Sequence, residues 1–346
     1  MSEEELANDF RNYLDSELPA NNPMSLAVSD LHMGATGGHS NLVEMLLEKL
    51  HAAPPSNLKV IFLIGDIVDL ICNDLDIICQ ENARIFECMD LIRQKEIRVI
   101  HVLGNHDIPV TKLFWFIDRS KKRRKAFVRN LSKSLNKALN PNDYCNIATM
   151  EVKDGSWVVY LHDKAKEIGR KPVGTIEIAP VQVAGSAPHF LMAHGYQFFP
   201  AFTRFGAPFW AMCMNFSNST KRWVDSVMNQ FGPDLVDNLD KFLEELREDH
   251  EEISSKKSKE RAKKLIQARD GWDKKRAEMN KENRDEKIRY YLENNKLSQI
   301  TKVIYGHTHE PEINDTGDIL NTGGWKLRRP SIVEIYRDGG VKLRNF

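Results

Sequence analysis

The sequence has few cysteines, no excess of either charge and no long hydrophobic run, and each shortage excludes a class of protein. Its five cysteines form no CxxC pair and no zinc-knuckle spacing, which argues against a disulfide framework. The 49 basic residues balance 49 acidic ones, so the whole molecule has no positive excess to attract nucleic acid or an anionic membrane. The acidic start at residues 1–5 is unlike a signal peptide, and we predict a cytoplasmic protein.

The aromatic stretch at residues 196–216 is not expected to span a membrane. A spanning helix needs about twenty mainly apolar residues without interruption. This stretch is interrupted by Pro200, Arg204, Gly206 and Pro208. Peripheral contact with a membrane surface through residues 196–216 stays open as an alternative.

Strands and helices alternate along the first hundred residues. Apolar residues at helical spacing predict a helix within residues 1–20. Beyond it the pattern predicts strands and helices in turn, at residues 24–28, 41–51, 60–64, 77–92 and 99–103. Further strands are expected at residues 157–161, 190–193 and 302–305, followed by a hairpin over 331–343 with an Asp-Gly turn. This alternation predicts an α/β fold with helices covering the faces of a sheet.

The composition changes between residues 197 and 300. An aromatic opening is followed, after Lys241, by a stretch in which roughly half the residues are charged and glycine and proline are almost absent. Mixed charges of this kind are typical of a solvated helical hairpin. The sequence therefore predicts a catalytic domain made of residues 1–196 and 301–346, with 197–300 as a helical insertion or cap.

Five predicted strands end in carboxylate, amide or imidazole side chains. Open α/β folds place their ligand sites at such strand ends. Two of the clusters also have i, i+2 spacing, which puts both side chains on one side of extended backbone. The clusters are Asp30/His32, Asp66 with Asp69, Asn105-His106-Asp107, His194-Gly195 and His307/His309.

These side chains are a ligand set for hard or borderline metal ions. The candidate ligands are seven oxygen and nitrogen donors without a thiolate, which favours Mn, Fe or Zn. Seven donors suffice for two divalent ions if one carboxylate bridges them. Two such ions can clamp a phosphoryl oxygen and lower the pKa of a shared water, so that hydroxide attacks phosphorus in line. The set is Asp30, His32, Asp66, Asn105, His194, His307 and His309.

His106 is left for proton transfer to a leaving alkoxide, or for stabilising charge in the transition state. Asp107 is its sequence neighbour and is expected to act with it as a catalytic residue. Asp69 is a second candidate for orienting the His106 ring. His162, which also ends an apolar strand, is an alternative to His194 as a ligand, although Gly195 favours His194 because it permits close backbone approach.

The five clusters together resemble the motifs of the calcineurin-like metallophosphoesterase family. The resemblance covers about residues 30–196 and 301–346, and it implies a four-layer α-β-β-α fold, a β-sandwich flanked by helices, with a dinuclear site at the sheet edge. It implies that one ion is held by Asp30, His32, Asp66 and His309. The other ion would be held by Asp66, Asn105, His194 and His307, and His106 would be the acid or a phosphate contact.

Within that family, the Gly-Asp-x-x-Asp form and residues 306–311 and 321–325 resemble the branch containing UDP-2,3-diacylglucosamine pyrophosphatases. The resemblance implies a nucleotide-lipid or other phosphorylated small-molecule substrate. The aromatic opening of the insertion could line an acyl-chain groove. Two departures weaken the match, because that branch usually has arginine at the position of His106 and a shorter insertion.

Two other functions are compatible with the sequence. The basic run at residues 119–125 could neutralise nucleic-acid phosphates, as in a nuclease of the same superfamily, which could also include phosphomonoesterases. Alternatively, the fold could be a scaffold that binds a protein partner through the insertion. No ligand position is missing, which favours an enzyme.

Overall fold

The structure is a computed structural model that describes most of the chain outside one long internal segment. The described residues are 2–35, 39–70, 73–107, 120–170, 172–180, 187–195, 197–198, 284–325 and 330–346. Residues 1–203 and 283–346 form one compact unit. Most of the predicted insertion lies outside the described residues, so the boundaries 197 and 300 stay a prediction.

The first sheet has six strands in the order β13-β12-β1-β2-β3-β4. Its parallel half, β1 to β4, follows chain order, and β12 adds to β1 in the antiparallel sense. The strands are β1 (Ser25–Val28), β2 (Val60–Ile64), β3 (Arg98–Val102), β4 (Tyr144–Cys145), β12 (Ser331–Ile335) and β13 (Val341–Asn345).

The second sheet has seven strands in the order β10-β11-β9-β8-β5-β6-β7. At its centre β8 and β9 run parallel, so their carboxyl ends lie at the same edge. The strands are β5 (Ile147–Lys153), β6 (Ser156–His162), β7 (Gly174–Pro180), β8 (Phe190–Ala193), β9 (Lys302–Tyr305), β10 (Pro311–Ile313) and β11 (Ile319–Thr322).

Helices cover the outer faces of both sheets. Those on the first sheet include α3 (Ser40–Ala52), α4 (Leu75–Glu81), α5 (Ala83–Arg93) and α7 (Ser120–Ser134). The chain begins with α1 (Glu3–Asn12), a π-helical turn η1 (Tyr13–Glu17) and α2 (Leu18–Asn21). Helix α12 (Arg284–Asn294) packs on the second sheet. No helix in the described ranges is long and apolar enough to cross a membrane.

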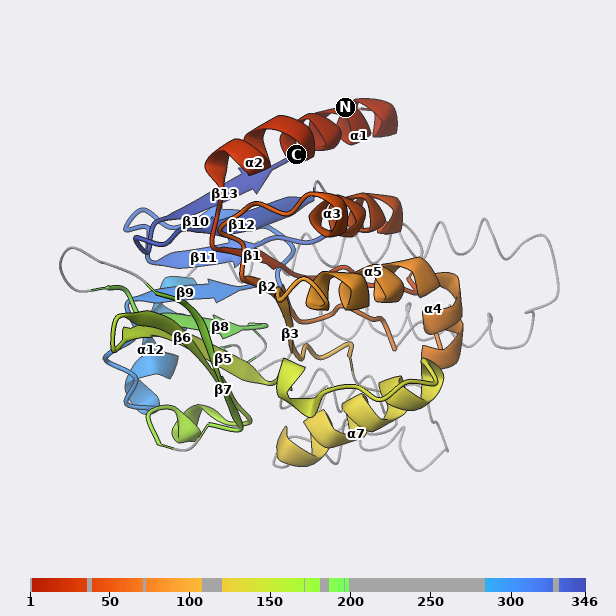
Figure 1. Ribbon diagram of the computed structural model, residues 1–346. Helices are drawn as coiled ribbons and strands as arrows, with labels where there is room; N and C mark the ends of the chain where they lie inside the picture. The colour runs from red at the N-terminus through yellow and green to blue at the C-terminus, as the bar shows by residue number, and fades with distance from the viewer. Residues whose placement is uncertain are drawn as a thin grey trace, which may run out of the picture. The chain divides into compact units, whose positions relative to one another are not determined.

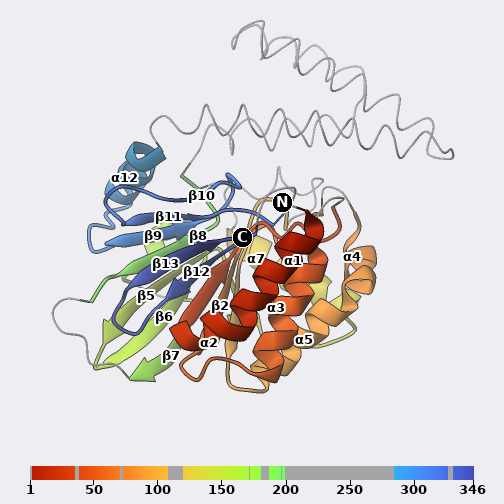
Figure 2. The same ribbon diagram turned by 90° about the horizontal axis from the view of Figure 1, so that it is seen from above.

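The core is divided into three layers because strand side chains alternate between two faces. In β2, Ile61 and Leu63 face the helices, whereas Val60 and Phe62 face the second sheet. A third apolar cluster lies between α12 and the outer face of β8 and β9. Figures 1 and 2 show the resulting order of helices, sheet, sheet and helix. The predicted four-layer α/β fold is confirmed.

The N-terminal segment is fixed to the end of the chain. The Phe10 ring contacts Phe346 and Trp325 edge-on, with centroids 4.7 and 5.6 Å apart. The Tyr13 hydroxyl donates a 2.7 Å hydrogen bond to the buried carboxylate of Glu334 on β12. The two termini consequently lie close together (Figure 1).

Candidate metal centre

The five predicted clusters follow β1, β2, β3, β8 and β9, and the structure brings the strand ends of both sheets together. Backbone hydrogen bonds join the loops, because Asp30 N–H donates to Gly65 O and Gly306 N–H donates to His194 O. The two sheets are joined directly as well, since His307 N–H donates to the Asp30 carboxylate at 2.9 Å. Loops from both sheets therefore form one site.

The described ligand atoms gather into three overlapping groups, in each of which all atoms lie within 4.8 Å of one another. That spread is compatible with ligands on opposite sides of one ion at about 2.0–2.2 Å each. Asp66 belongs to two groups and His32 to two, so the groups form a continuous cluster. The groups are Asp30/His32/His309, Asp66/His194/His307 and His32/Asp66/His106.

Three imidazole rings are oriented with Nε2 toward the cluster. His32 and His106 each direct Nδ1 to a different oxygen of Asp69, both at 3.0 Å. His194 Nδ1 donates to the carbonyl of Ile64 at 3.0 Å. A hydrogen bond at Nδ1 fixes the neutral tautomer whose Nε2 lone pair is available to a metal.

Among the candidate ligands, two buried oxygen atoms lack a hydrogen bond within the described part of the chain. They are Asp30 Oδ1 and Asn105 Oδ1. Buried acceptors without donors are costly in proteins and call for an explanation such as an ion. Asp30 Oδ1 lies 3.1 Å from His309 Nε2, and His309 Nε2 lies 3.2 Å from His32 Nε2. These residues therefore fit divalent ions with oxygen and nitrogen ligands.

Asp107 holds the loop after β2. It forms none of the hydrogen bonds described for the His106 ring. Its carboxylate is fully buried and accepts backbone hydrogen bonds from Asp66, Ile67, Val68 and Gly104, and a side-chain one from His101 at 3.1 Å. Burial opposes its ionisation, but His101 and the amide donors hold the pKa of Asp107 below its usual range. The carboxylate that orients His106 is Asp69.

The site residues have strained backbones. Five non-glycine residues of the cluster have φ between 47° and 76°, in the left-handed region. Each such conformation is maintained only by its surroundings and is common at functional sites. The residues are Asp30, His32, Asp66, His307 and His309.

Two motif glycines are required by close approach. A Cβ atom at Gly104 would lie 2.2 Å from the Asp66 amide nitrogen, and one at Gly65 would lie 2.4 Å from the His194 ring. Both distances are too short for carbon. The motif glycines therefore allow the loops to pack directly against Asp66 and His194.

Opposite charges dominate the electrostatics of the metal-free cluster. Burial opposes the charged ring of His194, but the carboxylates of Asp66 and Asp30 raise its pKa to about 9. Burial would raise the pKa of Asp66, yet His194 and His106 keep it well below its usual value. Burial lowers the pKa of His32 to about 4, so that ring is neutral and ready to bind a metal at pH 7.

Six of the seven predicted ligands belong to the three groups, and the seventh, Asn105, follows β3 at the same edge. His162 belongs to none of the groups, and its Nε2 contacts Thr149 Oγ1 at 3.1 Å. Of the basic run, Arg124 is buried and forms an ion pair with Asp163 at 2.8 Å, so it does not face a ligand.

Phe198 of the aromatic opening is buried against Tyr305. The remainder of that opening, apart from Gln197, lies outside the described residues.

Three supporting residues were not identified from the sequence. His101, assigned no role because it had no neighbouring motif residue, donates to Asp107. Ser29 donates to Asp30 Oδ2 at 2.5 Å. Arg284 contacts the segment after His309. A histidine within the apolar strand 98–102 indicates a buried polar contact, and this signal could have identified His101. The sequence around Arg284 contains no comparable signal.

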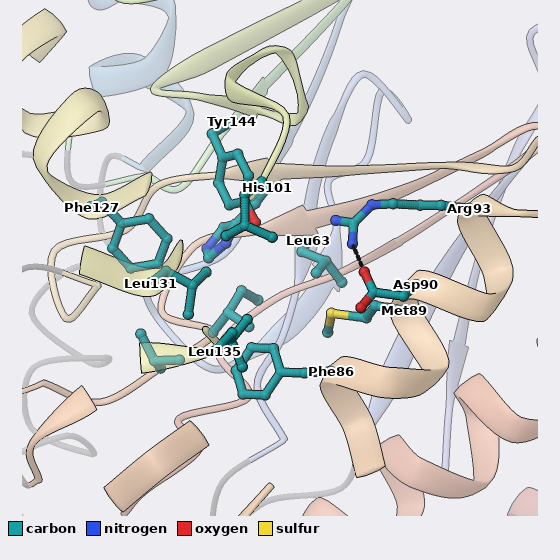
Figure 3. A pocket seen from close by; sticks show the side chains of 13 residues that line it. Leu63, Phe86, Met89, Asp90, Arg93, His101, Phe127, Leu131, Leu135 and Tyr144 are labelled. Carbon is teal, nitrogen blue, oxygen red and sulfur yellow. Dashed lines mark hydrogen bonds and ion pairs between the residues drawn. The ribbon is translucent and has the colours of Figure 1, made fainter. Parts of the chain in front are cut away.

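A separate apolar cavity lies behind the loop after β2 (Figure 3). It is lined by residues of β3, α5 and α7, and contains none of the candidate ligands. Phe86, Phe127 and Leu131 supply much of its apolar wall, and His101 reaches it from β3. At its rim Arg93 donates to Asp90 at 3.1 Å.

Comparison with known proteins assigns the family. Residues 25–311 match the family model of the calcineurin-like phosphoesterases, and the chain belongs to this family. The chain is a metal-dependent phosphoesterase of this family, and its histidine and aspartate groups are suited to hold metal ions.

No curated protein sequence matches the chain. Among solved structures, a dimetal phosphatase from Danio rerio is similar at 13% identity. The alignment covers 93% of this chain and 96% of that one, with a TM-score of 0.34.

Proposed function

We propose that the protein hydrolyses a phosphodiester or pyrophosphate bond with two divalent ions held by the seven predicted ligands. The observation that carries the proposal is the continuous cluster in which Asp66 and His32 each belong to two groups of potential ligands. Asp30, His32 and His309 would hold one ion, and Asp66 would bridge to the second. The second ion would be completed by Asn105, His194 and His307.

Bound divalent ions would supply charge that stabilises a phosphoryl oxygen and would activate water for in-line attack. Manganese is the preferred candidate, with iron or zinc as alternatives, because the donors are carboxylate, amide and imidazole groups. Asp69 holds the His32 ring in the required tautomer before any ion binds, and the Ile64 carbonyl holds Nδ1–H of His194 so that Nε2 is the nitrogen that would lose its proton to a metal.

His106 is proposed to handle the leaving-group proton. Its ring is partly exposed, its Nδ1 is held by Asp69, and its Nε2 lies 4.0 Å from Asp66 Oδ2. The Nε2 edge of the ring therefore lies beside Asp66, next to which the reacting phosphate would bind. Asp107 is proposed to be a positioning residue, because its carboxylate is occupied by backbone amides of residues 66–68.

The substrate class is proposed from the resemblance to UDP-2,3-diacylglucosamine pyrophosphatases. A nucleotide-lipid pyrophosphate is the first candidate, and a simple phosphodiester is the second. The nuclease alternative is weaker, since Arg124 of the basic run forms a buried pair with Asp163. The scaffold alternative is disfavoured because no predicted ligand position is missing from the sequence and six of the seven lie in the three groups.

The test is hydrolysis of bis-p-nitrophenyl phosphate by metal-stripped protein to which Mn²⁺ is returned. We expect activity that depends on Mn²⁺ and that falls more than about 100-fold in Asp66→Asn, because loss of a bridging ligand should exceed the 10–100-fold effect of a residue that only supports one. Asp154→Asn is the matched control. Asp154 is also an aspartate with φ near 50°, but it is exposed in a turn far along the chain from every motif.

Unchanged activity in Asp66→Asn, or equal loss in Asp154→Asn, would contradict the assignment. The substrate class is tested by comparing UDP-2,3-diacylglucosamine with UDP-glucose, which lacks acyl chains. Preference for the acylated compound supports the lipid-pyrophosphate branch. Preference for oligonucleotides, with turnover that falls steeply as salt increases, would instead favour the nuclease.

A further inference from the structure

Arg284 connects the start of α12 to the segment that follows the candidate ligand His309. Its guanidinium is buried and donates from Nη2 to Glu310 at 2.9 Å and from Nη1 to Glu312 at 2.9 Å. Glu310 is the residue after His309, and Glu312 lies in β10. Arg284 therefore binds both sides of Pro311 at once, a geometry suited to the planar guanidinium.

His309 needs such support. Its backbone has φ of 60°, a conformation that costs a non-glycine residue free energy and persists only where neighbours impose it. Its Nε2 must also stay within reach of Asp30 and His32, at 3.1 and 3.2 Å. On one side the ring packs near Gly324, where an added Cβ would lie 3.0 Å from His309 Cβ. On the other side the pairs with Arg284 fix the chain.

We propose that Arg284 is a positioning residue for His309, and that it selectively maintains the ion site formed with Asp30 and His32. The proposal rests on the ligand assignment made above. Arg284 is also the second residue after the segment 204–282. The catalytic domain therefore resumes after that segment with a residue that contacts the chain beside one of the two proposed ion sites.

A matched arginine on the same helix provides the control. Arg289 also pairs with a carboxylate of the β10–β11 region, Asp318, at 3.0 Å, but it is about half exposed. An exposed pair of this kind contributes little to stability. Arg284→Met and Arg289→Met thus remove the same charge from the same helix, and only the first removes a contact beside His309.

The experiment measures Mn²⁺ binding to the full metal-stripped chain by calorimetry, with electron paramagnetic resonance to distinguish coupled pairs of ions from single ions. We expect Arg284→Met to bind one ion as the wild type does and the other 10–100-fold more weakly. Its spectrum should change from that of a coupled pair to that of a single ion at limiting Mn²⁺. Arg284→Lys should be intermediate, because lysine can reach one carboxylate but not form the same fork, and Arg289→Met should bind both ions within twofold of wild type.

His309→Ala identifies which hypothesis fails. If His309→Ala weakens one ion but Arg284→Met does not, the positioning role of Arg284 is wrong while the ligand set stands. If His309→Ala binds both ions normally, the ligand set is wrong, and this inference with it. Equal weakening of both ions by Arg284→Met, together with a lower melting temperature of the metal-free protein, indicates a purely structural role and also overturns the inference. Should Arg284→Met not fold, Glu310→Gln tests the same contact with Glu312 intact.

Discussion

Replacing Asp107 by asparagine should destabilise the fold and the metal centre together. The Asp107 carboxylate accepts four backbone hydrogen bonds, two at each oxygen, and one from His101. Asparagine has one oxygen, and its NH₂ group would face N–H donors. Whichever way the amide turns, at least two buried backbone N–H groups lose their acceptor.

The expected cost follows from that count. A buried donor without an acceptor costs about 1–3 kcal/mol, so Asp107→Asn should lower the free energy of unfolding by about 2–6 kcal/mol. This is a large part of the 5–15 kcal/mol that stabilises a typical domain. Because one of the affected amides belongs to Asp66, the affinity for metal should fall as well.

The assay is urea denaturation of the metal-free protein, followed by Mn²⁺ titration of the variant. Asp338→Asn is the control, since Asp338 accepts a backbone hydrogen bond from Gly340 in an exposed turn. A loss below about 1 kcal/mol would refute the account of Asp107 as the anchor of this loop. So would a variant with normal stability and metal binding whose kcat alone falls, because that pattern belongs to a catalytic acid or base.

Three further predictions follow from buried groups. Burial lowers the pKa of His162 to about 4, below the 6.5 of the unfolded chain, so its stabilising effect is complete above about pH 6.5 and is lost as the pH falls toward 4. In urea denaturation, wild type should lose up to about 3 kcal/mol relative to His162→Gln over that range, and parallel pH curves would contradict this. Tyr13→Phe removes the donor to Glu334 and should cost about 1.5–3 kcal/mol by the same method, whereas an unchanged midpoint would show that the bond contributes nothing. With the pKa of His194 at about 9, Mn²⁺ binding at pH 7 should release a proton, measured by calorimetry in two buffers of different ionisation enthalpy; equal heats in both would be the contrary result.

Most of the fold could be predicted because its central strands are continuous apolar runs. The strands expected at 60–64, 190–193 and 302–305 have the same limits in the structure, since strands buried on both faces are nearly continuous apolar runs, and Lys302 is the one charged residue among them. The helix expected over 77–92 is two helices, α4 and α5. They are separated at Asn82, whose side chain donates to the Ile78 carbonyl and ends the first one.

Two of the strands that were not predicted, β7 and β10, form the edges of the second sheet. β7, for example, has threonine and glutamate among its apolar residues, so its pattern is weaker than that of a central strand. The candidate ligands were visible because strand ends of an α/β fold converge. Of their supports, Asp69 was a candidate from its motif, but His101 and Arg284 were not, because they act on partners 6 and 26 positions away and spacing alone does not show which carboxylate a ring or guanidinium will meet.

The place of β12 beside β1 has a consequence for synthesis of the protein. β1 lies between β2 and β12 in the first sheet, yet roughly 300 residues of chain separate β1 from β12. A ribosome adding about 5–20 residues per second needs about 15–60 s to produce them. During that interval the edge of β1 that later pairs with β12 has no strand partner, and the Tyr13 hydroxyl has no Glu334 carboxylate to bind. The first sheet is therefore completed only after the last two strands of the chain have been synthesised.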